Sequence, residues 1–183
     1  MSAGRNILST RTYMRSAMSE IKKKLRLVLF ERCNRNCDGC CNKDWDLKSL
    51  PVETNFTGYH EVLLTGGEPM LRPMLVIHVA KLIRKKQPDT RIYLYTAKTD
   101  PWAELLAVLH YIDGLCVTLH DQSDVDPFLS FSRILGDVAL TKSLRLNVFS
   151  GVKIHKLSLW KTKRVQWIKN CPLPKGEVLK RFM

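Results

Sequence analysis

The sequence predicts an α/β protein whose strands form a parallel sheet. Apolar runs of strand length alternate along the chain with stretches of helical periodicity, which is the pattern of repeated βα units. The expected strands are 25–30, 61–65, 91–95, 114–120 and 144–149, with a sixth at 165–168. Five or six such units are fewer than the eight that close a barrel, so we expect a sheet that stays open.

Helices are expected between these strands. Apolar residues recur at helical spacing over 71–86, and the basic run at 84–86 then suits the negative end of the helix dipole. Asp100-Pro101 provides an N-cap and a first-turn proline for a helix over 102–110, and Asp126-Pro127 begins another that ends near 135. Residues 44–58 show no clean period, so a loop with a short helical piece is expected there.

The charge of the chain is concentrated at its two ends. The net charge is +13, of which residues 1–24 carry six Lys/Arg against Glu20 alone and residues 151–183 carry nine against Glu177 alone. The middle, 25–150, is neutral. This division predicts a basic, mobile N-terminal arm, a neutral core and a basic C-terminal segment. Basic ends favour an acidic protein partner, a nucleotide or a nucleic acid, although they also serve solubility alone.

The chain lacks the patterns of export and membrane insertion. No apolar run approaches the about 18 residues of a membrane span, and the N-terminus has no apolar stretch of a secretory signal. Either Met1 or Met18 could be the natural start. Four of the six cysteines fall within 33–41, and adjacent cysteines make poor disulfide partners. We therefore expect a cytoplasmic protein that uses its thiols for metal ligation.

Those cysteines follow the first expected strand directly. Cys33, Cys37 and Cys40 have the spacing C-x3-C-x2-C, and Cys41 comes immediately after them. Thiolates suit zinc or iron–sulfur clusters. A zinc site usually draws four ligands from two separated pairs, for which Cys41 or His60 would be needed here. Three ligands from one loop suit a [4Fe–4S] cluster that keeps one iron open. Zinc remains the alternative.

A second motif, Gly66-Gly67-Glu68-Pro69, ends the second expected strand. The two glycines allow a close approach to the backbone that a side chain would block. Glu68 offers an acceptor for an ammonium group, and Pro69 stiffens the turn. Taken alone, this string is a common turn. After a C-x3-C-x2-C loop it is much more specific.

The two motifs together resemble the radical S-adenosylmethionine superfamily over about residues 25–150. The resemblance implies a partial (β/α)6 TIM-like barrel, a [4Fe–4S] cluster and S-adenosyl-L-methionine as cofactor. It implies that Cys33, Cys37 and Cys40 bind three irons while the cofactor chelates the fourth. The cofactor-binding positions that it implies are Gly66, Gly67, Glu68 and Pro69 for the methionyl amine, with Thr118 and Asn147 near the ribose and carboxylate.

The cluster loop departs from the common family pattern at one position. An aromatic residue usually precedes the third cysteine, whereas this chain has Gly39. The run from Gly39 to Trp45 is similar to the loop of glycyl-radical activating enzymes, including the anaerobic ribonucleotide reductase activase, with Cys41 in place of a tyrosine. The resemblance implies reductive cleavage of S-adenosylmethionine to a 5′-deoxyadenosyl radical that abstracts hydrogen, with electrons from a flavodoxin- or ferredoxin-like donor. Activation of a glycyl-radical enzyme is one substrate class, and modification of a nucleotide or nucleic acid, including deazaguanine formation, is the other.

A function of another class remains open from the residues alone, namely a non-catalytic, zinc-stabilised nucleic-acid-binding module. The segment 160–167 interleaves tryptophans with basic residues, as nucleic-acid-binding surfaces do. The same two tryptophans, Trp160 and Trp167, would serve equally well to anchor a terminal strand. His120 follows the fourth strand and is a candidate for contact with substrate or cofactor. Neither its role nor that of Cys41 is decided by the sequence.

Overall fold

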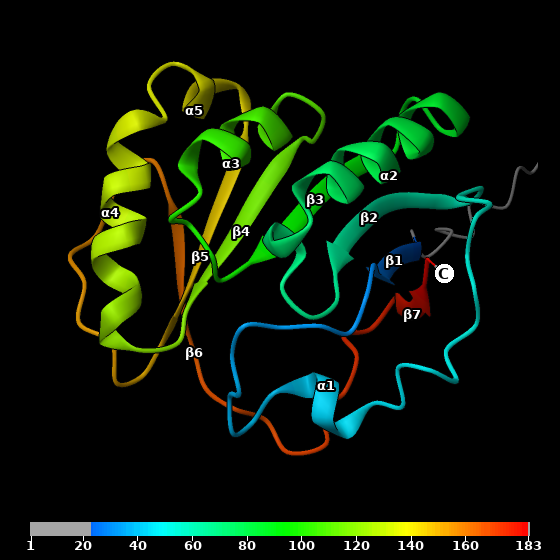
Figure 1. Cartoon of the computed structure of the whole chain (residues 1–183), viewed down its shortest axis with the longest axis horizontal. Helices are drawn as coiled ribbons and strands as arrows, with labels where there is room; N and C mark the ends of the chain where they lie inside the picture. The colour runs from blue at the N-terminus through cyan, green and yellow to red at the C-terminus, as the bar shows by residue number, and fades with distance from the viewer. Residues whose placement is uncertain (1–22, 183) are drawn as a thin grey trace, which may run out of the picture.

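A seven-stranded, all-parallel sheet forms the centre of the molecule in the computed structural model, which describes residues 23–182 (Figure 1). The order across the sheet is β6-β5-β4-β3-β2-β1-β7. The strands are β1 (Lys23–Val28), β2 (Tyr59–Thr65), β3 (Arg91–Thr96), β4 (Gly114–Leu119), β5 (Ser143–Phe149), β6 (Lys161–Val165) and β7 (Glu177–Arg181). The open parallel sheet confirms the partial TIM-like barrel expected from the sequence.

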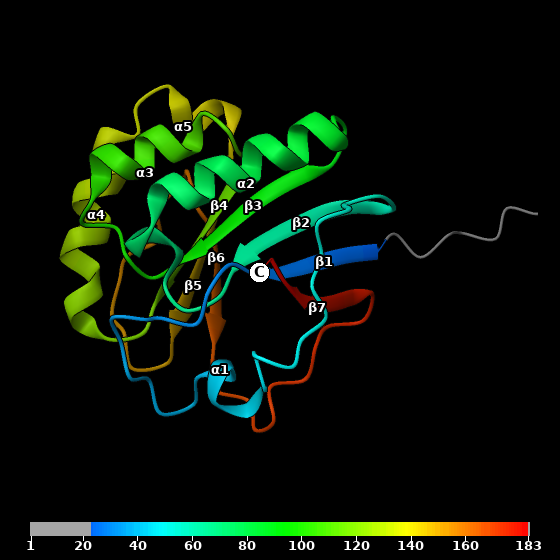
Figure 2. The same cartoon turned by 45° about the vertical axis from the view of Figure 1, so that its right-hand side comes forward.

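Helices cover the outer face of this curved sheet (Figure 2). They are α2 (Pro73–Lys86), α3 (Trp102–Leu109), α4 (Val125–Ile134) and α5 (Val138–Thr141), with short 3-10 turns η1 (Pro69–Leu71) and η2 (Gln122–Asp124) at strand ends. The short helix α1 (Cys41–Asp44) lies apart, beside the cysteine loop. Within residues 23–182, no helix has the length and apolar character needed to cross a membrane.

The two faces of the sheet differ in chemistry because side chains alternate along each strand. In β5, Leu144, Leu146 and Val148 are buried, and they belong to the core that the helices cover. Arg145 and Asn147 point to the opposite, inner face and are only partly buried. The inner face is therefore polar, and it is the side on which a ligand can meet charged groups.

Both edge strands come from the C-terminal segment, and this is where the sequence-based prediction was wrong. The sixth strand is β6 rather than 165–168, and β7 was not predicted. Neither strand has an apolar run, because β6 is largely exposed and β7 is only half-buried. Edge strands are often polar, so they give little periodic signal. β7 pairs with β1, and Arg26 of β1 forms an ion pair with Glu177 at 2.8 Å.

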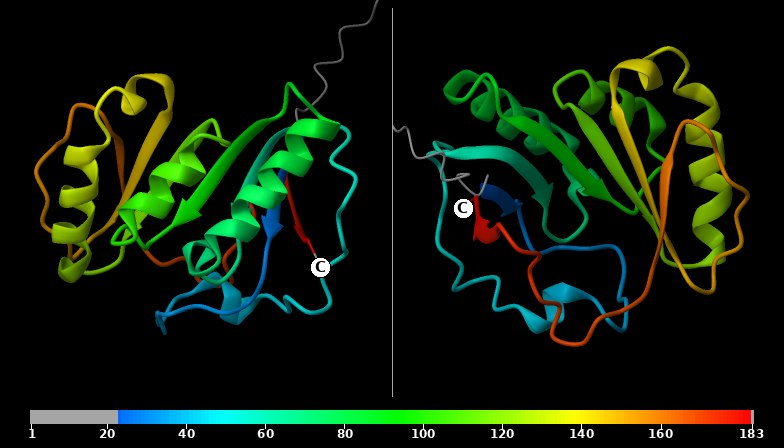
Figure 3. Two further views of the ribbon diagram at one scale, coloured as in Figure 1. Left: turned by 45° about the horizontal axis from the view of Figure 1, so that its top comes forward. Right: turned by 180° about the vertical axis from the view of Figure 1, so that it is seen from behind.

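The N-terminal arm predicted over 1–24 lies almost wholly outside the described residues. The C-terminal segment, by contrast, supplies the strands at both edges of the sheet, β6 and β7. Its stretch between β6 and β7 lies beside α1 and the cysteine loop (Figure 3). Residues 151–182 therefore take part in the surroundings of the cysteines.

Candidate metal centre

The cysteine loop is fastened to the Gly-Gly-Glu turn by backbone hydrogen bonds. The amide of Gly67 donates to the carbonyl oxygen of Phe30 at 2.7 Å, and the amide of Glu68 donates to that of Arg32 at 3.0 Å. These bonds continue the pairing of β1 with β2 beyond the ends of both strands. The two motifs recognised separately in the sequence are thus a single unit of structure.

One cavity of about 210 Å³ brings the two motifs together. Cys33, Cys37 and Cys40 carry free thiols and all line it. The other lining residues are Arg26, Arg35, Cys41, Asn42, Trp45, Thr65, Gly66, Gly67, Glu68, Tyr95, Thr96, Ala97, Thr118, His120 and Trp167. The cavity is therefore formed by the cysteine loop, the carboxyl ends of β2, β3 and β4, and the C-terminal segment.

The glycines of the turn are required by the packing of the cysteine loop. A Cβ on Gly67 would lie 1.9 Å from the carbonyl oxygen of Arg32, and one on Gly66 would lie 2.5 Å from that of Phe30. Gly66 also has a φ of 136°, which L side chains rarely adopt. Its carbonyl oxygen accepts a 2.7 Å hydrogen bond from the Asn42 side chain. The turn and the loop consequently fit each other only without side chains at these two positions.

Glu68 is buried, and both of its carboxylate oxygens accept hydrogen bonds from the protein. Only 2% of the residue is exposed. Its Oε1 accepts hydrogen bonds from the Met70 amide at 2.9 Å and the Thr96 hydroxyl at 2.5 Å, while Oε2 accepts from the Ala97 amide at 2.9 Å. Burial raises the pKa of Glu68, and these hydrogen bonds oppose that shift. The carboxylate therefore ties the end of β2 to the end of β3 beside the cavity.

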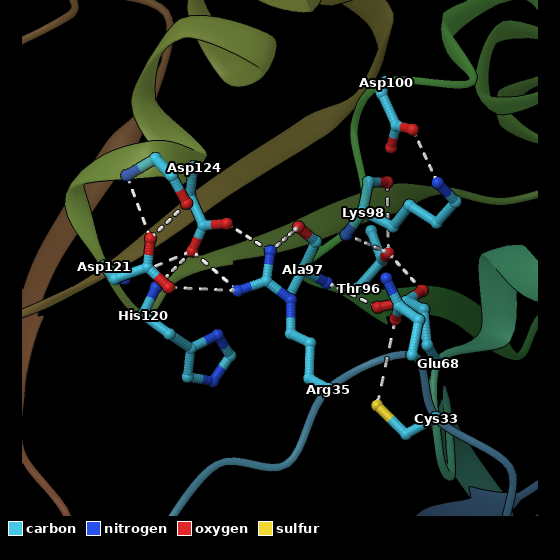
Figure 4. A network of polar contacts seen from close by, with 12 residues as sticks. Cys33, Arg35, Glu68, Thr96, Ala97, Lys98, Asp100, His120, Asp121 and Asp124 are labelled. Atoms are coloured by element: carbon cyan, nitrogen blue, oxygen red, sulfur yellow. Dashed lines mark hydrogen bonds and ion pairs between the residues drawn. The ribbon is translucent and has the colours of Figure 1, made fainter.

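Arg35, between the first two cysteines, anchors the loop to the end of β4 (Figure 4). Its guanidinium donates to both carboxylate oxygens of Asp124, with Nη1 to Oδ2 at 3.0 Å. It also approaches Asp121 and the Ala97 carbonyl oxygen. The side chain of Asp124 is 3% exposed and accepts a 2.7 Å hydrogen bond from the His120 amide. A buried carboxylate thus holds both the loop and the turn after β4.

Aromatic side chains close another side of the cavity. The His120 ring is stacked against Phe149 and Trp167, with ring centroids 5.1 and 5.5 Å apart. Burial, together with the nearby Arg35 guanidinium, lowers the pKa of His120, so its imidazole is neutral at neutral pH. Trp167 also packs on Gly39, where a Cβ would meet the indole at 2.5 Å. An aromatic ring therefore does lie against the loop position before Cys40, but it comes from the C-terminal segment.

The C-terminal segment has a second attachment on the other side of Cys40. Cys41 forms a disulfide with Cys171, across a sequence separation of 130 residues. Metal ligation rather than disulfide formation was expected of the cysteines, so this pair was not predicted. The turn over 168–171 brings Cys171 next to Cys41, with 5.3 Å between their Cα atoms.

A family model described as "4Fe-4S single cluster domain" matches residues 24–133, more than half of the chain. The chain belongs to the 4Fe-4S single cluster domain family. This is a radical-SAM-associated family, so the chain is an iron–sulfur protein of the radical SAM type. No curated protein matches the chain.

The residues present fit the [4Fe–4S] cluster of this family. Three free thiols on one loop line one cavity, and burial together with the neighbouring Cys40 raises the pKa of Cys37. Metal binding would release that proton, since a coordinating thiol is deprotonated. Within residues 23–182, no three His, Cys, Asp or Glu side chains are grouped to bind a single metal ion. In a four-iron cluster, each cysteine binds a different iron.

The structure brings most, but not all, of the expected cofactor residues of this iron–sulfur protein to the cavity. Thr118 lines it together with Gly66, Gly67 and Glu68, whereas Pro69 and Asn147 do not. The amide nitrogen of Asn147 donates to the Cys116 sulfur at 3.2 Å and to the Thr118 hydroxyl at 3.4 Å. Asn147 thus contacts the cavity only through Thr118.

Breaking the Arg35–Asp124 ion pair should lower the stability of the protein. Asp124→Asn leaves the half-buried Arg35 guanidinium without its carboxylate, so we expect the free energy of unfolding to fall by about 2 kcal/mol. Lys98→Gln, which removes a pair whose Asp100 side chain is 61% exposed, should change it by no more than about 0.5 kcal/mol. Urea unfolding of the two variants measures the difference. Equal values for both would show that Arg35 does not anchor the loop.

Proposed function

We propose that the protein is a radical S-adenosylmethionine enzyme that generates a 5′-deoxyadenosyl radical and abstracts hydrogen from a substrate. One observation carries this proposal above the others. Three free thiols with the C-x3-C-x2-C spacing and the Gly66–Pro69 turn line or border one cavity. A cluster alone requires only the thiols, whereas the adjoining turn adds polar groups that an organic cofactor would need.

The proposed division of work among the residues follows their positions. When bound, the cluster and S-adenosylmethionine supply the reductive carbon–sulfur cleavage, and the protein supplies binding, orientation and exclusion of water. Cys33, Cys37 and Cys40 would hold the cluster. Gly66, Gly67, Glu68 and Pro69 would hold the methionyl amine, with Thr118 and Asn147 on the ribose and carboxylate side. Electrons would come from an external flavodoxin- or ferredoxin-like donor.

The finer proposal, a glycyl-radical activase, rests on the loop after the second cysteine. Gly39 and Asn42 are the positions at which this loop is similar to the activases, and both make specific contacts here. Gly39 accommodates Trp167, and Asn42 donates to Gly66. Modification of a nucleotide is the second candidate, and the inner face of the sheet supports it, as argued below.

Anaerobic reconstitution tests the proposal directly. The protein should become brown, hold about four irons per chain, and form 5′-deoxyadenosine when dithionite and S-adenosylmethionine are added. Chromatography of the small-molecule products measures the nucleoside. A colourless protein with one tightly held zinc would overturn the proposal, and so would a full cluster that yields no 5′-deoxyadenosine.

A further inference from the structure

Three cations gather on the inner face of β5 and β6. The register pairs Arg145 with Lys161 and Asn147 with Lys163, and paired residues of neighbouring parallel strands project from the same face. Arg145 is half-buried, while Lys161 and Lys163 are exposed. We call these three side chains the inner cationic cluster.

Arg145 is held in place without being neutralised. Its guanidinium lies 4.1 Å from the centroid of the Tyr93 ring, which orients it by a cation–π contact. Two titratable side chains lie near Arg145, namely Cys116 and Tyr95. Burial raises the pKa of Cys116 to about 11 and that of Tyr95 to about 12, so both are uncharged at physiological pH. Among residues 23–182, no carboxylate forms an ion pair with Arg145.

Arg26, on the same face, is by contrast neutralised by a carboxylate. It donates two hydrogen bonds to the Glu177 carboxylate, at 2.8 and 3.0 Å. That pair joins β1 to β7 and cancels the charge of Arg26. Within residues 23–182, the inner cationic cluster has no such counterpart, so it keeps an excess positive charge on the inner face of the sheet.

The inner cationic cluster lies two strands away from the cysteine cavity on the same face of the sheet. Thr118 lines the cavity, Asn147 donates to Thr118, and Lys163 is the register partner of Asn147. Neighbouring strands lie about 4.8 Å apart, so β6 is roughly 10 Å from β4. A small molecule with its reacting end in the cavity would reach the cations with an anionic group at this distance.

We propose that Arg145, Lys161 and Lys163 bind a phosphate group of a small-molecule substrate whose reacting end lies in the cysteine cavity. This inference rests on the proposed function and, of its two substrate classes, favours the nucleotide. A planar guanidinium flanked by two ammonium groups suits a phosphate that carries more than one charge. The contact of Arg145 with the Tyr93 ring is not an ion pair, so it leaves that charge available to the ligand.

Titration of the full chain with pyrophosphate tests the site, with the thermal unfolding temperature as the measure of binding. A ligand that binds only the folded state raises the unfolding temperature, from which the affinity follows. Arg145→Gln and Lys163→Gln should each weaken pyrophosphate binding by about tenfold, the value of one charge-assisted contact. Lys85→Gln, on the exposed side of α2, should leave the affinity unchanged. Lys163 is exposed, so its variant reports on binding even where Arg145→Gln unfolds.

The alternatives give different results. If all three variants bind pyrophosphate equally more weakly, the proposed site is overturned, and the anion is attracted only by the overall positive charge of the protein. If citrate binds more strongly than pyrophosphate, the site prefers a carboxylate to a phosphate, and the proposal is overturned. An oligonucleotide that displaces pyrophosphate with a steep salt dependence would point instead to a nucleic acid. Cys37→Ala should still bind pyrophosphate, so failure of the radical chemistry and failure of this site are distinguishable.

Discussion

Cys37→Ala is expected to abolish both the iron–sulfur cluster and the formation of 5′-deoxyadenosine. The loop provides three thiols for three irons, and residues 23–182 offer no other free thiol that lines the cavity. Cys41 is engaged with Cys171, and Cys116 is buried in β4 and does not line the cavity. Iron analysis and the visible absorbance of the reconstituted protein measure the first loss. Product analysis measures the second.

The matched control is the double variant Cys41→Ala/Cys171→Ala. It removes a thiol adjacent to Cys40 without touching a proposed ligand, so the cluster and the product should both remain. Retention of a full cluster in Cys37→Ala would contradict the assigned ligands. Loss of the cluster in the double variant would show instead that Cys41 is a ligand and that its pairing with Cys171 is not the functional state.

The sequence was sufficient for the parts of the site that are encoded locally. Buried strands have continuous apolar runs, and the cysteine spacing lies within one loop, so β1 to β5 and the three thiols were predicted. The parts that were missed depend on pairs far apart in the chain. Arg35 and Asp124 are separated by 89 positions, and nothing in the spacing of either residue indicates the other.

Gly39 is another residue whose role depends on a partner far away in the chain. In the sequence, it is a departure from the aromatic residue that the family usually has before the third cysteine. In the structure, Trp167 packs on this glycine, so the departure and the tryptophan explain each other. The signal available was the interleaved segment 160–167, which was interpreted as either a nucleic-acid surface or an anchor. Trp160 is the anchor, since it is buried and donates to Ser132, whereas Trp167 belongs to the site.

Gly67→Ala should be among the most destabilising single substitutions in this protein. The added Cβ would lie 1.9 Å from the carbonyl oxygen of Arg32, an atom of the backbone that cannot rotate away. Relief requires the cysteine loop to move off the turn, which breaks the hydrogen bonds from Gly67 to Phe30 and from Glu68 to Arg32. We expect a loss of about 3 kcal/mol in the free energy of unfolding, the upper range for overpacking.

Gly151→Ala is the control, because a Cβ there would meet nothing within 4 Å. Its effect should stay within about 0.5 kcal/mol. Urea unfolding compares the two variants, and iron content tests whether the displaced loop still assembles a cluster. Because the loop and the turn are one unit, the stability and the cluster should be lost together in Gly67→Ala. A variant as stable as Gly151→Ala would show that the turn does not hold the loop, and the glycines would then be explained by the cofactor alone.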